Sequence, residues 1–433
     1  MFKQINSTDC ICGKQHIFTS KTVIEKGAIN KLPQILKELE ANSAFIIADK
    51  NTYCAAGEKV FDILSSEKIK VEKYVFKNDI LEPDEANVGL AVMNFNPNCD
   101  VIIGVGSGVI NDISKIVANV SGKKYIIVGT APSMDGYASA TSSMTMDGLK
   151  ISLNSKCADV IIGDIDVLCN APTKMMISGL GDMLAKYVSI CEWRISNLIN
   201  GEYYCEDIAQ LVRDSLKKCV DNAEGLLNRD DNAVKSVFEG LIICGAAMKF
   251  ARLSRPASGI EHYLSHIWDM RGVVFGTPVE FHGIQCAVGT LIAAKLYEKI
   301  KNFTPNKEKA LKYVNTFDFA KWSEELREFL GKGAESMIAL EEEEQKYSVE
   351  SHKKRIDIII EKWNEILKII DEELPEISKL EKLFDDVGLP KTMAEIGLCE
   401  DILPFTFKSA KDIRDKYVLP RLCWDLGIID EIV

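Results

Sequence analysis

The chain has 433 residues, of which 47% are hydrophobic, 27% charged and 8% aromatic. This length allows two or three domains of about 150 residues, and the composition excludes a disordered, fibrous or miniature disulfide-stapled protein. The 52 Lys and Arg residues against 64 Asp and Glu residues give a net charge of −12. This charge disfavours nucleic acid and anionic membrane surfaces as partners.

Residues 1–6 lack the apolar region of a secretory signal, and no run reaches the roughly 18 consecutive apolar residues of a membrane helix. The thirteen cysteines are an odd number without tight spacing, which is typical of reduced thiols. We therefore expect a cytoplasmic protein without a membrane partner.

One cluster of metal-ligand residue types lies near the N-terminus, in Cys10-Ile-Cys12-Gly-Lys-Gln-His16. These residue types would suit part of a metal site, but the segment lacks the second cysteine pair of a zinc knuckle. The sequence therefore favours a structural or coincidental origin for the cluster over metal binding.

Helix-like and strand-like segments alternate over the first third of the chain, which is typical of an α/β domain with a mostly parallel sheet. Residues 27–40 have helical periodicity, and residues 43–49 read as a buried strand. Two short apolar runs, 101–103 and 125–128, flank a helical stretch and predict a βαβ unit.

A predicted hairpin follows in residues 142–153, which alternate around Asp147-Gly148. Residues 160–162 are the last candidate strand. We therefore expect a dinucleotide-binding α/β domain over residues 1–171.

After Pro172 the chain consists of long segments with helical periodicity. We expect an all-helical domain over residues 172–433, with the active site in the cleft between the two domains. Its clearest predicted helix carries an apolar stripe from Ile356 to Ile370 and stops near Pro375. The acidic run at residues 341–344 predicts a solvated face or a helix start.

A glycine-rich turn, Gly104-Val-Gly106-Ser-Gly108-Val-Ile-Asn-Asp112, follows the strand at 101–103 and opens an amphipathic helix. Glycines let the backbone approach a pyrophosphate, and a helix N-terminus offers N–H groups to it. The turn does not fit the GxGxxG fingerprint. Asp49, at the end of an earlier strand, is placed either to hold an adenosine ribose or to cap a helix.

Three of the five histidines, His262, His266 and His282, lie within 21 residues. Ser258 and Glu261 predict a capping box that starts a helix, and the i, i+4 spacing then puts His262 and His266 on one face. The pair is either two core or surface histidines, or part of a metal or proton-handling site.

Asp182 follows the glycines of Ser178-Gly-Leu-Gly and is predicted to begin a helix. An aspartate in that position is usually a cap. Together with two imidazoles, however, its carboxylate makes an open site for a divalent ion. The nucleotide-binding pattern nearby favours redox chemistry through a cofactor over an oxygenase.

Five segments carry a resemblance to a known family: GVGSGVINDISK at 104–115, TAPSMDGYAS at 130–139, GLGDMLAKY at 179–187, SRPASGIEHYLSHIWDM at 254–270 and HGIQ at 282–285. The chain resembles the sn-glycerol-1-phosphate dehydrogenases, within the iron-containing alcohol dehydrogenase and dehydroquinate synthase superfamily. The likeness covers nearly the whole chain, although residues 303–375 are longer than the usual linker.

This resemblance implies a set of site residues. Asp182, His262 and His282 match the metal ligands. Asp135, Asp182 and His266 match the residues at the substrate, with Asp182 and His266 catalytic. Asp49 would lie at the adenosine ribose, and the rest of the dinucleotide would be lined by Gly108, Val109, Ile110, Asn111, Asp112, Thr130, Ala131, Pro132, Ser133 and Ser139. Val109 departs from the usual GGGS pattern, which removes a hydroxyl contact but not the backbone cradle.

The implied reaction is a reversible, metal- and NAD(P)-linked reduction of dihydroxyacetone phosphate to sn-glycerol 1-phosphate by a homodimer, with a role in phospholipid metabolism. Nickel, zinc and ferrous iron all suit the ligands; bacterial relatives suggest nickel and archaeal ones zinc. Asp49 favours NAD, whereas Lys50 leaves NADP open. Lys186 and Arg255 are the cations nearest the predicted ligands for the substrate phosphate.

Three other functions remain open on the sequence. One is a glycerol or alcohol dehydrogenase that acts on an unphosphorylated substrate. A second is a dehydroquinate-synthase-like lyase, although such enzymes usually present Glu where this chain has Asp182. The third is a nucleotide-binding regulator with a structural metal.

Overall fold

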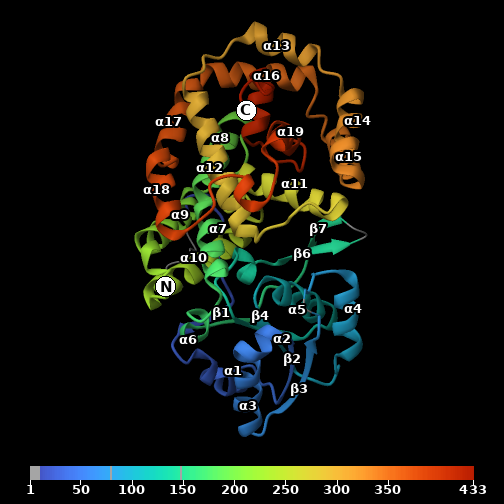
Figure 1. Cartoon of the computed structure of the whole chain (residues 1–433), viewed down its shortest axis with the longest axis vertical. Coiled ribbons are helices and arrows are strands. Elements are labelled where there is room, and N and C mark those ends of the chain that lie inside the picture. Colours follow the sequence, from blue (N-terminus) through green and yellow to red (C-terminus); the bar gives the residue numbers. More distant parts are fainter. Residues whose placement is uncertain (1–9, 79, 147–148) are drawn as a thin grey trace. The chain divides into compact units, whose positions relative to one another are not determined.

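The computed structural model describes residues 10–78, 80–146 and 149–433 (Figure 1). The chain forms two compact units. The first contains the described residues up to Met183 together with Gln210–Leu253, and the second contains Leu184–Ala209 and Ser254–Val433. Among the described residues, no helix is both long and apolar enough to cross a membrane.

The first unit is built on a six-stranded parallel sheet, as predicted. The strand order is β1-β8-β5-β4-β2-β3. The strands are β1 (Lys21–Glu25), β2 (Ser43–Asp49), β3 (Lys70–Phe76), β4 (Val101–Gly106), β5 (Lys124–Gly129) and β8 (Val160–Asp164). Every strand therefore ends at the same edge, where α/β folds bind their ligands.

Helices cover both faces of this sheet because the central strands are apolar on both sides. One face packs on α1 (Leu32–Glu38) and α3 (Glu58–Ser66) in a single core cluster. On the other face, Gly104 of β4 leaves room for Ser114 of α5 (Gly108–Ser121). The predicted helix at 27–40 is a 3-10 turn (Ala28–Lys31) followed by α1.

The predicted hairpin is also present, as an antiparallel pair with Met146 opposite Leu149. Its strands are β6 (Thr141–Met146) and β7 (Leu149–Asn154). The predicted turn residues Asp147 and Gly148 lie outside the described residues.

Helix α10 (Asp231–Ala251) packs with the sheet although it follows it by many residues. A Cβ atom on Gly129 or Gly163 would come within 2.8 or 2.4 Å of the Phe238 ring, so these glycines admit α10. The other longer helices of this unit are α4 (Glu85–Asn94) and α7 (Thr173–Leu184), and α9 (Glu206–Asp221) reaches into it. The boundary predicted between residues 171 and 172 stays a prediction.

The second unit has only helices among its described residues, so the all-helical prediction is confirmed. They are α8 (Lys186–Asn200), α11 (Ile260–Phe275), α12 (His282–Lys301), α13 (Lys307–Asn315), α14 (Phe319–Leu330), α15 (Ala334–Glu344), α16 (Val349–Glu361), α17 (Trp363–Glu373), α18 (Ile377–Val387), α19 (Leu403–Ala410) and α20 (Leu419–Asp425). Part of the long segment 303–375 has a clear place: Trp322, Leu326 and Met337 pack on Ile267 of α11.

Two expectations for this unit are wrong, one of them only in part. The apolar stripe from Ile356 to Ile370 lies on two helices, α16 and α17, which meet at Lys362. The acidic run at residues 341–344 ends α15 rather than starting a helix, whereas the predicted solvated face is present in the exposed Glu342, Glu343 and Glu344. Glu341 is buried and accepts a hydrogen bond from Arg421 Nη2 at 2.9 Å, because a buried carboxylate needs a charged partner.

Candidate active site

The carboxyl edge of the sheet holds the predicted dinucleotide residues. β4 ends at Gly106, and α5 begins at Gly108 without a side-chain cap from Ser107. The first N–H groups of a helix have no intrahelical acceptor and lie at its positive end. The N–H of Thr130, which follows β5, donates to Gly106 O at 3.1 Å. The two loops are therefore joined by backbone atoms beside the start of α5.

Two of the predicted cofactor residues, Asn111 and Asp112, have structural side-chain contacts. Asn111 donates through Nδ2 to Gly136 O at 3.1 Å and accepts from Tyr125 Oη at 3.0 Å. Burial raises the pKa of Asp112, against the opposing charge of Lys115. What this turn offers an anionic cofactor is therefore its backbone N–H groups.

The loop 130–139 is held in place by side chains and by a close backbone approach. Tyr137 Oη donates to Ala131 O at 2.7 Å, and Ser178 Oγ donates to Ser133 O at 3.2 Å. A Cβ atom on Gly179 would lie 1.8 Å from Pro132 O, so only glycine allows this contact. Ser139 Oγ lies 2.8 Å from Thr141 Oγ1.

Asp182 does not begin a helix, so that expectation is wrong. It lies in the last turn of α7, and the preceding glycines continue the helix instead of forming a turn. Position 179 is a glycine because Pro132 O approaches it too closely for a Cβ atom. The Asp182 side chain is fully buried, and its Oδ2 accepts the Asp135 N–H at 2.9 Å. The structure thus brings together two predicted substrate residues.

Asp49 ends β2 and caps the short helix α2 (Lys50–Thr52). Its Oδ1 accepts the N–H groups of Asn51 and Thr52 at 2.8 and 2.9 Å. The capping alternative for this residue is therefore present in the structure.

The three clustered histidines lie on two neighbouring helices of the second unit. His262 and His266 are on α11, and His282 is the first residue of α12. The ring centroids of His262 and His282 are 5.0 Å apart, and those of His266 and His282 are 6.1 Å apart. The i, i+4 spacing predicted that His262 and His266 share one face of α11, and the packing of α12 on α11 adds His282.

Glu261, which its sequence position predicted only as a helix cap, is a site residue. Its Oε1 lies 2.8 Å from His262 Nδ1, and the carboxylate is fully buried. A carboxylate acceptor selects the tautomer with the proton on Nδ1 and leaves Nε2 as a ligand atom. Adjacent helix residues do not normally face each other, so no spacing signal could have found this pair.

The other imidazole is oriented in the same way. Ser265 Oγ lies 3.2 Å from His282 Nδ1 and donates to Gln285 Oε1 at 3.0 Å. Cys286 Sγ lies 3.6 Å from His282 Nε2. Burial opposes ionisation of the Cys286 thiol, but the neighbouring His262 and His282 rings outweigh it and lower the pKa.

The predicted capping box of Ser258 and Glu261 is wrong. Helix α11 begins at Ile260 with Gly259 as its N-cap. Glu261 Oε1 accepts the Gly259 N–H at 2.7 Å, and Glu192 Oε2 accepts the Ile260 N–H at 2.8 Å. The first turn is therefore satisfied by two buried carboxylates instead of by a serine.

These two carboxylates share one buried environment. A Cβ atom on Gly259 would lie 2.5 Å from Glu192 Oε2 and 2.8 Å from Glu261 Oε2. Burial, and then the charge of Glu261, raise the pKa of Glu192 to about 8. Near neutral pH, Glu192 is therefore mostly protonated.

Arg255 does not serve as the phosphate cation that its position in the sequence suggested. It is buried, and its Nε and Nη2 donate to Glu202 at 2.8 and 2.6 Å. Nη1 donates to Tyr417 O, and Nη2 also donates to Ser196 Oγ. A bidentate pair of this kind fixes the guanidinium. Lys186 is also buried and donates to Ala257 O at 2.9 Å.

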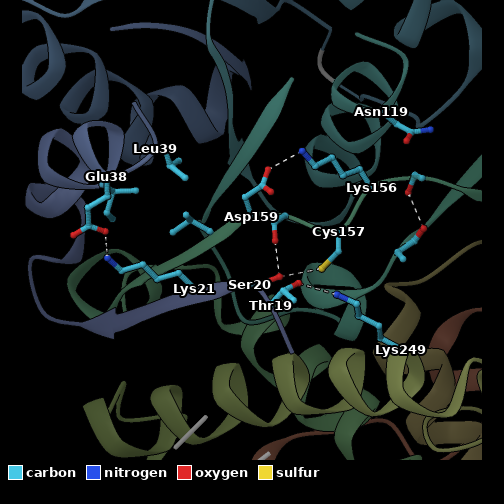
Figure 2. Close-up of a pocket in the computed structure, with 15 residues that line it drawn as sticks. Thr19, Ser20, Lys21, Glu38, Leu39, Asn119, Lys156, Cys157, Asp159 and Lys249 are labelled. Carbon is cyan, nitrogen blue, oxygen red and sulfur yellow. Dashed lines mark hydrogen bonds and ion pairs between the residues drawn. The ribbon is translucent and has the colours of Figure 1, made fainter. Parts of the chain in front are cut away.

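A cavity of about 580 Å³ in the first unit lies away from these residues (Figure 2). It is lined by Lys21 at the start of β1, Val160 at the start of β8 and Asn119 near the end of α5. These are the amino ends of the strands, whereas cofactors bind at the carboxyl ends of parallel strands. The cavity is therefore not the dinucleotide site.

Comparison with known proteins assigns the chain to a family. Residues 23–172 match the family of iron-containing alcohol dehydrogenases. A protein of Bacillus licheniformis named glycerol-1-phosphate dehydrogenase, with NAD(P)+ in its name, is 30% identical over 67% of this chain and 74% of its own length. The chain belongs to the glycerol-1-phosphate dehydrogenase family. A member from Halalkalibacterium halodurans is 29% identical over 95% of this chain and 94% of its own length.

Solved structures agree with this family assignment at the level of the fold. Glycerol dehydrogenase of Schizosaccharomyces pombe has a TM-score of 0.56 and 21% identity over 89% of this chain and 96% of its own. Maleylacetate reductase of Agrobacterium tumefaciens has a TM-score of 0.61 and 12% identity over 95% of each chain. As a member of the glycerol-1-phosphate dehydrogenase family, the chain is an oxidoreductase.

Proposed function

We propose that the enzyme reduces the C2 carbonyl of dihydroxyacetone phosphate to sn-glycerol 1-phosphate with NADH or NADPH, and catalyses the reverse reaction. The relatives' name supports the substrate. The observation that carries the proposal is the pair of imidazoles His262 and His282, each with a side-chain partner at Nδ1. Such partners orient histidines that bind a metal.

The residues fit a single divalent metal ion. Asp182, His262 and His282 form the proposed ligand set, two neutral imidazoles and one buried carboxylate. An open site of this composition suits zinc, nickel or ferrous iron, and we expect nickel or zinc. The ion would supply a Lewis acid for the carbonyl oxygen, and the nicotinamide would supply the hydride.

The chain's own groups bind and orient the reactants. The N–H groups at the start of α5 and the loop 130–139 would hold the dinucleotide phosphates. Asp49 Oδ1 is used as a helix cap, so a ribose contact would use Oδ2. Asp135 is positioned through its own N–H by Asp182 and would contact the substrate hydroxyl.

His266 is the proposed proton donor. Its ring is half-buried, stacks on His282 at 6.1 Å and is not one of the proposed ligands. An imidazole is a common general acid, and here it would give a proton to the carbonyl oxygen as negative charge grows there. A cytoplasmic location and a homodimer remain predictions.

The test is NADH oxidation by protein that is stripped of metal and reloaded with Ni²⁺, Zn²⁺ or Fe²⁺. We expect turnover with dihydroxyacetone phosphate and none with dihydroxyacetone. His262→Ala should lose one metal equivalent and the turnover, whereas His266→Asn should keep the metal and lose turnover by about 100-fold.

Other outcomes would contradict the proposal. Equal turnover with both substrates would indicate a glycerol or alcohol dehydrogenase. Tight binding of NAD and metal without net NADH oxidation would indicate a lyase that returns its hydride. A metal content that His262→Ala leaves unchanged would refute the ligand set.

A further inference from the structure

The N-terminal cluster Cys10, Cys12 and His16 is drawn together by a tight turn. The Gly13 N–H donates to Cys10 O at 2.8 Å, and Gly13 has φ +72°, a conformation that favours glycine. The turn brings Cys12 Sγ within 3.1 Å of Cys10 Sγ and within 3.3 Å of His16 Nε2. Three metal-ligand atoms from seven residues therefore converge on one point.

The cluster is built into the first unit rather than left on its surface. Cys10 is 6% exposed and His16 is 2% exposed. The His16 ring packs on Phe250 of α10 with centroids 5.4 Å apart. The sulfur atoms are too far apart for a disulfide, which needs about 2.0 Å, so both cysteines are thiols.

We propose that Cys10, Cys12 and His16 bind a zinc ion that is separate from the catalytic metal. Two thiolates and one imidazole are the donors that zinc prefers in structural sites. A tetrahedral site with Zn–S bonds of about 2.3 Å separates its sulfur atoms by about 3.8 Å, so the two thiols need to open only slightly. Each thiol releases its proton to water as the bond to zinc forms.

The fourth ligand is a water molecule or a thiolate from one of the other cysteines. X-ray absorption spectroscopy at the zinc edge distinguishes these two ligands. Two sulfur atoms around the zinc ion indicate a water ligand, and three indicate a further cysteine. Both outcomes support the site, and a shell without sulfur overturns it.

The position of the cluster indicates what the ion does. The segment after His16 is tied down at Thr19 and Ser20: Lys249 Nζ donates to Thr19 Oγ1 at 3.2 Å, and Ser20 Oγ donates to Ala158 O at 2.6 Å (Figure 2). Further along α10, Gly245 lies against the Asp135 backbone, since a Cβ atom there would be 2.9 Å from Asp135 O. The zinc site would therefore fasten the chain before β1 to the helix that supports the loop 130–139.

The experiment uses His262→Ala to remove the catalytic metal, so that remaining zinc reports on the cluster. Protein purified with zinc and a reductant is measured by mass spectrometry of the metal. We expect His262→Ala to keep one zinc equivalent and His262→Ala with Cys10→Ser and Cys12→Ser to lose it. The matched control removes two exposed cysteines, Cys54→Ser and Cys399→Ser, and should keep the zinc.

A second measurement avoids the risk that the double cysteine variant misfolds. Cobalt titrated into His262→Ala should produce a thiolate-to-metal charge-transfer band, and Cys12→Ser alone should weaken it. A zinc chelator should lower the unfolding temperature of His262→Ala by about 3 °C or more and leave the triple variant unchanged.

The inference does not depend on the proposed reaction, and clear results would overturn it. Equal zinc in the triple variant and its control would refute the site. The loss of two hydrogens from Cys10 and Cys12 in unreduced protein, without bound zinc, would show a redox-active thiol pair instead.

Discussion

The carboxyl edge of the sheet and the helix pair α11–α12 use opposite means to present functional groups. The sheet edge relies on backbone atoms and on small residues, with Gly179 at the Pro132 carbonyl and Gly129 beneath the Phe238 ring. The helix pair relies on buried carboxyl groups, with Glu192 and Glu261 around the start of α11. The sheet edge should therefore tolerate a change of charge better than a change of side-chain volume. The helix pair should tolerate a change of volume better than a change of charge.

The largest expected effect is loss of the ion pair that the buried Arg255 makes with the half-buried Glu202. Arg255→Leu should lower the free energy of unfolding by about 3 kcal/mol, because it leaves a carboxylate without its partner. Urea denaturation measures this. Arg327→Leu, which breaks an exposed pair with Glu335, should cost under about 1 kcal/mol. A raised KM for the phosphorylated substrate with unchanged stability would return Arg255 to a phosphate-binding role.

A volume change at the sheet edge should have the next largest effect. Gly179→Ala adds a Cβ atom 1.8 Å from Pro132 O and should cost about 2 to 3 kcal/mol through overpacking. Cofactor affinity should fall as the loop 130–139 shifts. The control Gly89→Ala lies mid-helix in α4 with nothing within 4 Å of the new atom, and should stabilise by about 0.5 to 1 kcal/mol. Equal effects in the two variants would contradict the packing argument.

Removal of the charge beside His262 should weaken metal binding without removing a ligand. Glu261→Gln should lower metal affinity by about 10- to 100-fold, the usual cost of losing such a partner. Competition with a chromophoric chelator measures this affinity. Glu298→Gln, on the outer part of α12, is the matched control, and an unchanged affinity in Glu261→Gln would refute the orienting role.

The smallest effect, counted per pH unit, is a pH dependence of stability. Because the pKa of Glu192 rises from an ordinary 4.5 to about 8 on folding, the folded state holds a proton that the unfolded state has released between these values. The free energy of unfolding should fall with rising pH in this window, by up to about 1 kcal/mol per pH unit.

Glu192→Gln should remove this decrease in the free energy of unfolding with rising pH. Lys416 has the opposite effect on stability. Burial, and then the charge of Arg255, lower its pKa to about 7, so its contribution to the free energy of unfolding is lost as the pH falls from 10.5 to about 7. Urea denaturation of both proteins between pH 5 and about 7 avoids most of the Lys416 effect, and the difference between their two slopes reports on Glu192. An identical slope in the variant would contradict its raised pKa.

The central part of the sheet was predictable because its strands are continuous apolar runs. The strand predicted at residues 43–49 has the same bounds as β2, and the βαβ unit around α5 is present. The two edge strands, β1 and β3, were not predicted. They carry charged and half-exposed residues, since an edge strand has a neighbour on one side only. Their hydrophobic pattern therefore does not differ clearly from that of a loop.

By itself, the sequence determined the fold class, the family and the candidate residues, because glycine turns, apolar runs and histidine spacing are local properties of the chain. Only the tertiary structure decided what those residues contact. Glu192, for instance, accepts the N–H groups of Ile260 and of Leu419, which is 227 residues away. Burial and long-range packing determine the partners of buried polar groups. The local periodicity of a sequence contains no information about either.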